Sequence, residues 1–393
     1  AIGGSSAVAP AVNAWAVHLA SRGGALLEYT PSGSGSGNRN VRDGTWLVGG
    51  SDYPMTAAER AAYPTVANVP AMAFAAALAA NIPGVRTLVV PLCALGPLLA
   101  GSIEWWDDAR LVAANPTSAL PHVRVRVIVR TPGSGTTTVV TQSLASTVDV
   151  CGGPGARSNG HAQPNVTVGA TWPFTTAAAE ESGTRTLLNR VSATAGAVGY
   201  ASASAIAATA LTVVGILDET DNAVVYPTET AVRAALAASY VDAAARTVTP
   251  QAHPGVYPFV AVAYFVIQTA PGAGTDCVAF RRQLEAVSFG TATDQGNALS
   301  AAANFVPAVY REMLTDVLTA ARCDGQPVYP ELQPPQEKVN VAVAAGAASV
   351  AWALLAVLCG IGIHHAWQRH QRARALARCP SDEALPFAPS SSA

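Results

Sequence analysis

The sequence predicts an α/β fold over residues 1–332, because short apolar runs typical of strands alternate with amphipathic segments of helical period. Half of the 393 residues are hydrophobic, which is enough apolar surface to bury the core of roughly two domains. No repeat or charge block divides this part of the chain. It is therefore expected to form one folded unit.

The predicted strands are apolar runs such as LLEYT and VAVAYFVIQ, bounded by turn residues. They cover residues 26–30, 46–50, 123–130, 197–202 and 260–268. The predicted helices show apolar residues at helical spacing; in the first, Val8, Val12, Trp15 and Leu19 fall on one face. They cover residues 10–21, 137–146, 181–193, 228–238, 276–289 and 309–323.

Composition argues against several function classes. The formal net charge is -2 and only 12% of the residues are charged, so the chain has no positive field suited to a nucleic-acid backbone. The only lysine is Lys338, which argues against a phosphate-loop nucleotide site, a pyridoxal Schiff base and a lysine nucleophile. No cofactor, metal site or catalytic residue is predicted.

The C-terminal region predicts a single transmembrane helix at residues 339–363, because this stretch has no charge and is long enough to cross a bilayer. A buried alanine-rich core helix is the alternative. A proline-rich stalk precedes it, beginning near residue 326 and including residues 333–338.

The tail at residues 364–393 is basic close to the membrane helix. By the positive-inside rule the tail is cytoplasmic and the N-terminal part is extracellular, which predicts a single-pass membrane protein. The chain starts at Ala1, so a signal peptide is expected to have been removed or to lie outside this sequence.

Four cysteines fall in the predicted external part, where disulfides persist: Cys93, Cys151, Cys277 and Cys323. Their spacing does not match a zinc motif. Cys277 begins one predicted helix and Cys323 ends another, which favours a bridge between them. Four buried free thiols are the alternative.

Several glycine-rich turns stand between predicted strands and helices, at residues 3–10, 32–37 and 130–138. Such turns present backbone N–H groups at a helix N-terminus, where the dipole favours an anion. One positive charge and several hydroxyls accompany them; these are Arg130, Ser6, Ser34, Ser134 and Thr136. Taken together, they predict a site for a small oxyanion.

A carboxylate, Asp52, follows the strand at residues 46–50 and is expected in the same site. It would repel a fully deprotonated anion, but it can accept the O–H of an anion that still carries a proton. The hypothesis is that Asp52 makes the site prefer protonated oxyanions.

These segments resemble the periplasmic phosphate-binding proteins of bacterial high-affinity phosphate ABC transporters. The similarity runs over most of the outer region and is carried by GGSSAVAPAVNAW, LEYTPSGSGSG, VGGSDYPMT and RTPGSGTTT, with GAVGY and YPFVAVAYFVI further along. The arginine-glycine-serine motif together with the Ser-Asp turn is a far more specific signal than one glycine-rich loop.

The resemblance implies a type 2 periplasmic-binding-protein fold, with two lobes that hold phosphate in the cleft between them. Lobe one would comprise about 1–72 and 256–332, and lobe two about 73–255. The implied phosphate ligands are Ser6, Ala7 through its N–H, Ser34, Asp52, Arg130, Ser134, Gly135 through its N–H, and Thr136.

This sequence departs from the family pattern in three ways. Ala7 and Val8 replace a Phe-Pro pair, and Pro132 replaces an aspartate that normally lies beside the arginine. Pro132 therefore leaves selectivity among oxyanions open. The predicted C-terminal membrane helix is the third departure.

The function expected from this combination is a membrane-tethered receptor for inorganic phosphate or a related oxyanion. Closure of its lobes would serve uptake through a transporter or sensing through a signalling partner. An interaction ectodomain that keeps the fold but has lost or changed its ligand is the main alternative. A surface serine hydrolase is disfavoured, since no serine lies in a GxSxG motif with a histidine placed as base.

Overall fold

The computed structural model describes residues 2–23, 27–158, 161–220, 222–250, 255–307 and 310–333. These ranges belong to one unit that ends at Gln333. Within them, no helix combines the length and the apolar character needed to cross a membrane. The predicted membrane helix, the basic tail and residues 334–338 of the predicted stalk lie outside the described residues, so these three stay predictions.

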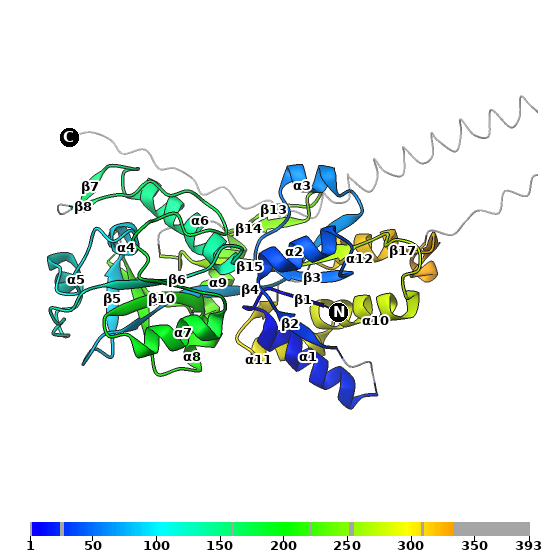
Figure 1. Ribbon diagram of the computed structural model, residues 1–393, viewed down its shortest axis with the longest axis horizontal. Coiled ribbons are helices and arrows are strands. Elements are labelled where there is room, and N and C mark those ends of the chain that lie inside the picture. Colours follow the sequence, from blue (N-terminus) through cyan, green and yellow to red (C-terminus); the bar gives the residue numbers. More distant parts are fainter. Residues whose placement is uncertain are drawn as a thin grey trace, which may run out of the picture. The chain divides into compact units, whose positions relative to one another are not determined.

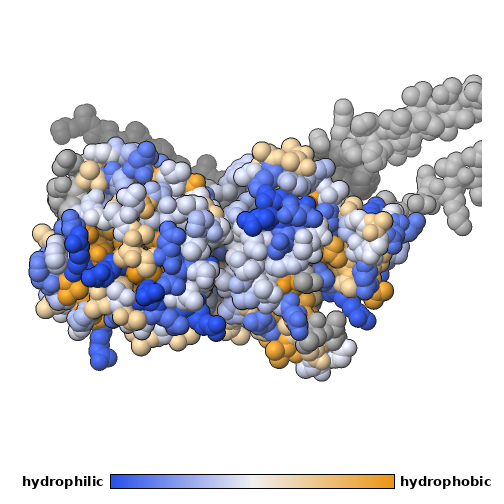
Figure 2. Space-filling view, viewed as in Figure 1, coloured by the Kyte–Doolittle hydropathy of each residue, from blue (hydrophilic) through white to orange (hydrophobic). Residues whose placement is uncertain are grey.

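One half of the sheet is formed by segments from both ends of this unit. β1 (Ile2–Gly4) lies between β2 (Tyr29–Pro31) and β3 (Val48–Ser51) and runs parallel to both, while β15 (Val260–Gln268) runs antiparallel to β3. The helices of this half are α1 (Ala9–Ser21), α2 (Ser34–Arg42), α3 (Ala57–Ala62), α10 (Cys277–Ala292), α11 (Asp294–Ala302) and α12 (Arg311–Ala320) (Figure 1). Figure 2 shows hydrophilic residues gathered over α2 and α3, where Arg42 pairs with Glu59.

The middle of the chain forms the other half. Its strands β6 (Arg126–Arg130), β9 (Ala179–Glu181) and β10 (Ala197–Ser202) are parallel, and β5 (Leu88–Pro91) runs parallel to β11 (Thr212–Asp218). The helices here are α4 (Leu92–Leu99), α5 (Ala109–Ala114), α6 (Gly135–Val150), α7 (Thr184–Ala193), α8 (Ala203–Ala207) and α9 (Glu229–Ala237) (Figure 1). This α/β alternation confirms the fold class predicted from the sequence.

A long strand, β4 (Val66–Asn81), joins the two halves. It pairs with β15 along Val66–Ala75 and with β10 along Ala76–Asn81. Every residue of β4 except Asn81 is buried. The predicted lobe boundary at residues 72 and 73 falls inside this strand, and the lobe limits stay a prediction.

The sequence analysis did not predict β4, because its many alanines have little strand preference and Pro70 has no N–H for the sheet. The pairing with β15 shifts register at this point: Tyr264 opposes Pro70, and the neighbouring Ala263 opposes Met72. Ala71 is therefore an extra residue on β4. Such a bulge lets a proline occupy the interior of a paired strand.

Shorter elements complete the fold. They are β7 (Arg157–Ser158), β8 (His161–Ala162), β12 (Ala223–Val225), β13 (Tyr240–Asp242), β14 (Thr247–Thr249), β16 (Val306–Pro307), β17 (Arg322–Cys323), β18 (Gln326–Pro327) and the 3₁₀ turn η1 (Pro330–Leu332). The last three correct the sequence prediction. The helix expected to end at Cys323 ends at Ala320, and the proline-rich stretch from residue 326 begins as folded chain, with Val328 and Tyr329 buried.

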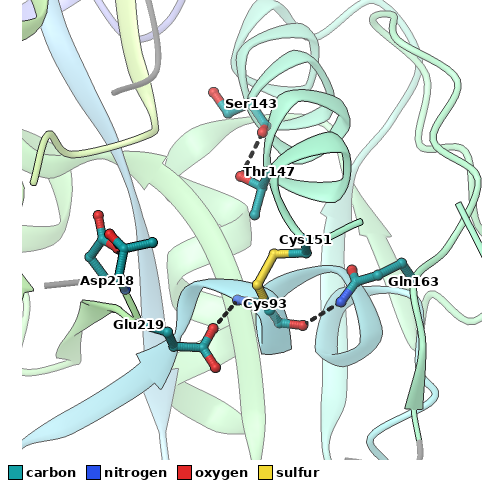
Figure 3. Close-up of a disulfide and its surroundings, with 8 residues drawn as sticks. Cys93, Ser143, Thr147, Cys151, Gln163, Asp218 and Glu219 are labelled. Carbon is teal, nitrogen blue, oxygen red and sulfur yellow. Dashed lines mark hydrogen bonds between the residues drawn. A yellow bond between two sulfur atoms is a disulfide. The ribbon is translucent and has the colours of Figure 1, made fainter. Parts of the chain in front are cut away.

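Two disulfides cross-link the described chain, and each joins two elements of the same half. Cys277–Cys323 joins α10 to β17, which confirms the predicted bridge. Cys93–Cys151, for which the sequence analysis gave no pairing, joins α4 to the end of α6. Around it, the Cys93 N–H donates to Glu219 and the Cys93 carbonyl accepts from Gln163 (Figure 3). These bonds fix the first turn of α4.

The packing of α1 against α10 depends on a glycine. Trp15 is buried, and its indole N–H donates to the Gly296 carbonyl and to the Ser300 hydroxyl on α11. A Cβ at Gly290 would lie 2.3 to 2.4 Å from three atoms of the Trp15 ring, so the ring lies directly against the α10 backbone.

We expect Gly290→Ala to destabilise the protein by about 1–3 kcal/mol, because the added methyl must displace a buried ring that neighbouring side chains hold in place. Gly272→Ala is the control, since a Cβ there meets no heavy atom within 4 Å. Urea unfolding followed by tryptophan fluorescence measures both. Equal midpoints for the two variants would contradict this account of the α1–α10 contact.

Candidate oxyanion site

The site lies where five loops leave the carboxyl ends of parallel strands. β1, β2 and β3 supply three of these loops, and β6 and β9 supply the other two. In open α/β sheets the carboxyl ends of the strands are the usual place for ligands. Here the loops from the two halves touch one another.

Asp52 is the carboxylate of the site and is buried. Its oxygen Oδ1 accepts from the Ser5 hydroxyl, and its Oδ2 lies 3.5 Å from the Thr136 hydroxyl at the start of α6. Its backbone N–H donates to Ser34 Oγ over 3.0 Å. Asp52 thus connects the β1 and β3 loops to the N-terminal turns of α2 and α6.

Arg130 is the cation of the site and is also buried, with 4% of its surface exposed. Its backbone N–H donates to the Tyr200 hydroxyl, which in turn bonds to Thr137. Its guanidinium donates from Nη1 to the hydroxyls of Ser6 and Thr184, and from Nη2 to the Ser182 carbonyl. The buried Nε has no partner within the described structure.

Two helix N-termini point their backbone N–H groups into this region. Ser134 caps α6 by accepting from the Thr137 N–H, and α2 begins at Ser34. Between them, the Gly35 N–H donates to the Gly133 carbonyl over 2.9 Å, so the two helix starts are joined by a backbone hydrogen bond. Gly33 and Gly133 both have φ of 94°, a conformation that favours glycine.

The close approach leaves no room for a side chain at Gly135, the first residue of α6. A Cβ at Gly135 would lie 2.1 Å from Ser34 Oγ and 2.7 Å from Asp52 Oδ2. The backbone of α6 therefore lies directly against the opposing loops, and this contact between the two halves is here called the closed arrangement.

Burial dominates the electrostatics of both charged groups. It raises the pKa of Asp52 to about 6, although hydrogen bonds from Ser5 and Ser34 and the charge of Arg130 act in the opposite direction. Burial likewise lowers the pKa of Arg130, which Tyr200 and Asp52 partly offset. Both charges have lost water without gaining a full ion pair, and this makes the region receptive to a charged hydrogen-bonding ligand.

The structure brings all eight sequence-predicted ligand residues to this place: Ser6, Ala7, Ser34, Asp52, Arg130, Ser134, Gly135 and Thr136. Ser5, Ser182 and Thr184 also lie in the site, and none of them was predicted from the sequence. Ser5 adjoins a predicted ligand, but the residue before Ser6 could be assigned to the site only from its bond to Asp52. Ser182 and Thr184 reach the site because β9, which ends just before them, pairs with β6. No sequence motif predicts this pairing.

Comparisons with known proteins agree with this fold. Residues 1–280 match the family model described as PBP superfamily domain. The phosphate-binding protein PstS of Haemophilus influenzae is 32% identical over 144 residues, which is 36% of this chain and 43% of that protein. PstS of Xylella fastidiosa is 30% identical over 141 residues, 34% of this chain and 37% of that protein. The chain thus matches less than half the length of these relatives.

A solved structure shares the fold over a larger span. The high-affinity periplasmic phosphate-binding protein PfluDING, bound with phosphate, superposes with a TM-score of 0.63 at 19% identity, covering 85% of this chain and 99% of that one. The two-lobed α/β arrangement and the family match over most of the chain lead to one conclusion: this chain belongs to the PBP superfamily.

Proposed function

We propose that this chain binds inorganic phosphate between the two halves of its sheet. The observation that carries the proposal is the meeting of one buried guanidinium, one buried carboxylate and two helix N-termini at the carboxyl ends of the strands. Such a donor-rich site suits a small tetrahedral anion. The names of the PstS relatives and of the phosphate-bound fold neighbour support the same ligand.

The single carboxylate narrows the ligand class. An ionised Asp52 can accept a hydrogen bond but cannot donate one, so it favours an anion that retains a proton. Phosphate near neutral pH keeps an O–H, whereas sulfate does not. We infer that Asp52 selects phosphate over sulfate.

The site is suited to binding rather than to hydrolysis. The two histidines whose side chains the structure describes stack on aromatic rings elsewhere, His18 on Phe289 and His122 on Trp105. Neither is placed to activate a serine of the site. The contacts across the cleft instead support a cycle in which ligand binding favours the closed arrangement.

We further propose that the folded part is tethered to a membrane by the helix predicted at residues 339–363, with the folded part outside and the basic tail in the cytoplasm. A tethered receptor of this kind would deliver phosphate to a transporter or report its presence to a signalling partner.

Titration calorimetry on the full chain tests the ligand. We expect phosphate to bind and Arg130→Ala to weaken binding at least about 100-fold, since it removes the cation of the buried site. Arg233→Ala is the matched control, because Arg233 pairs with Glu229 on the exposed face of α9. Sulfate should compete poorly.

Absence of both heat and thermal stabilisation at millimolar phosphate would refute the proposal and favour an interaction ectodomain. Sulfate competing as strongly as phosphate would instead refute the role given to Asp52.

The raised pKa of Asp52 predicts a pH dependence of folding in the ligand-free protein. The folded pKa of about 6 exceeds the reference value of 3.8, so the neutral carboxyl favours folding and this contribution is lost as the pH rises through 6. Asp52→Asn cannot ionise. Between pH 4.5 and 7.5 we therefore expect the variant to gain about 2 kcal/mol of unfolding free energy relative to wild type.

Urea unfolding at the two pH values measures this difference. A constant gap between wild type and Asp52→Asn would show that burial does not perturb the carboxyl.

Membrane fractionation tests the tether. The full chain, expressed with a signal peptide, should sediment with membranes and resist extraction by alkaline carbonate. A chain ending at Gln333 is the comparison. Release of the full chain by carbonate would contradict a membrane-spanning helix.

A further inference from the structure

The Arg130 guanidinium is held by neutral groups. Its hydrogen bonds go to the hydroxyls of Ser6 and Thr184, at 3.4 and 3.3 Å, and to the Ser182 carbonyl, at 3.1 Å. The residue two positions along the chain, Pro132, offers no carboxylate. Neutral acceptors orient a guanidinium without cancelling its charge, so none of these three hydrogen bonds neutralises the attraction of Arg130 for an anion.

Thr184 contacts both Arg130 and Ser6. Its Oγ1 accepts from Arg130 Nη1 and lies 2.9 Å from Ser6 Oγ, in the loop that follows β1. Ser6 belongs to one half of the sheet and Thr184 to the other. This Ser6–Thr184 contact, here called the hydroxyl bridge, therefore joins the two halves. Both hydroxyls of the bridge also accept a hydrogen bond from Arg130 Nη1.

The backbone fixes Thr184 in this position. It is the first residue of α7, and the preceding Gly183 is held by Thr186, whose hydroxyl accepts the Gly183 N–H and donates to the Gly183 carbonyl. The Ser182 carbonyl just upstream binds Arg130 Nη2. The start of α7 thus presents two acceptors to one guanidinium.

We propose that Thr184 is a positioning residue of the site. Its hydroxyl orients Arg130 toward the anion and, through the hydroxyl bridge, stabilises the closed arrangement. The inference rests on the proposed binding of phosphate, and it gives a role to the first residue of α7 beside the residues in the loops after β1, β2, β3, β6 and β9.

The test is phosphate titration of the full chain with Thr184→Val, which keeps the shape of the side chain and removes its hydroxyl. We expect binding about tenfold weaker, mainly through faster dissociation, because the guanidinium loses an acceptor and the cleft loses a cross-contact. Thr184→Ser restores the hydroxyl and should stay within about twofold of wild type.

Two controls separate positioning from simple loss of structure. Thr228→Val removes the capping hydroxyl of α9, in the same half, without touching Arg130 or Thr184, so it should bind phosphate nearly as wild type does. Ser6→Ala combined with Thr184→Val should weaken binding by less than the sum of the two single effects, since both substitutions remove the same bridge.

The outcomes are distinct. Wild-type affinity in Thr184→Val, equal weakening in Thr228→Val, or additive effects of the two bridge substitutions would overturn the inference while phosphate binding stands. If the wild-type chain does not bind phosphate, the proposed function fails, and the bridge is judged by urea unfolding of the ligand-free variants. Non-additive unfolding midpoints would then support it, and additive midpoints would overturn it.

Discussion

The continuous pairing of β4 is the constraint on which the rest of the fold depends. β4 pairs with β15 along its first part and with β10 along its second, so a single strand belongs to both halves of the sheet. Its side chains are mostly small and almost all buried, which lets other elements pack closely on it. The bulge at Ala71 lets Pro70 lie within β4 without ending the strand. The strands that carry the loops of the site are arranged on either side of β4 in the same sheet.

The site contains two buried ionisable groups, Asp52 and Arg130, and their hydrogen-bond partners differ. Asp52 receives hydroxyl donors, yet burial still raises its pKa. The hydrogen bonds that orient Arg130 go to oxygens that carry no charge, so they do not neutralise it, and Asp52 offsets the cost of its burial only in part. A ligand that both accepts from many donors and offers one proton would satisfy both residues, and the cost of burying each charge would be offset only when that ligand is present.

The alternation of strand and helix segments in the sequence was sufficient to predict the α/β fold class. The resemblance to phosphate-binding proteins indicated eight residues that the structure brings together, and their role as ligands stays a prediction. The sequence was insufficient wherever the structure depends on distant pairing. The alanines of β4 have no distinctive strand signal, the partner of Cys93 is set by the packing of α4 on α6, and Thr184 reaches the site only because β9 pairs with β6. The proline-rich segment that begins at Gln326 was wrongly predicted to start a stalk. Its first residues belong to the folded unit, because Val328 and Tyr329 are buried in the core.

The placement of the two disulfides has a mechanical consequence. Cys93–Cys151 ties α4 to α6, and Cys277–Cys323 ties α10 to β17, so neither covalent link passes from one half of the sheet to the other. Each disulfide limits the unfolding of its own half, while the contacts between the loops of the site include the hydrogen bonds from Gly35 to Gly133 and between Ser6 and Thr184. The disulfides therefore stabilise each half without adding a cross-link between the halves, so oxidation protects each half from unfolding and places no covalent restraint on one half relative to the other.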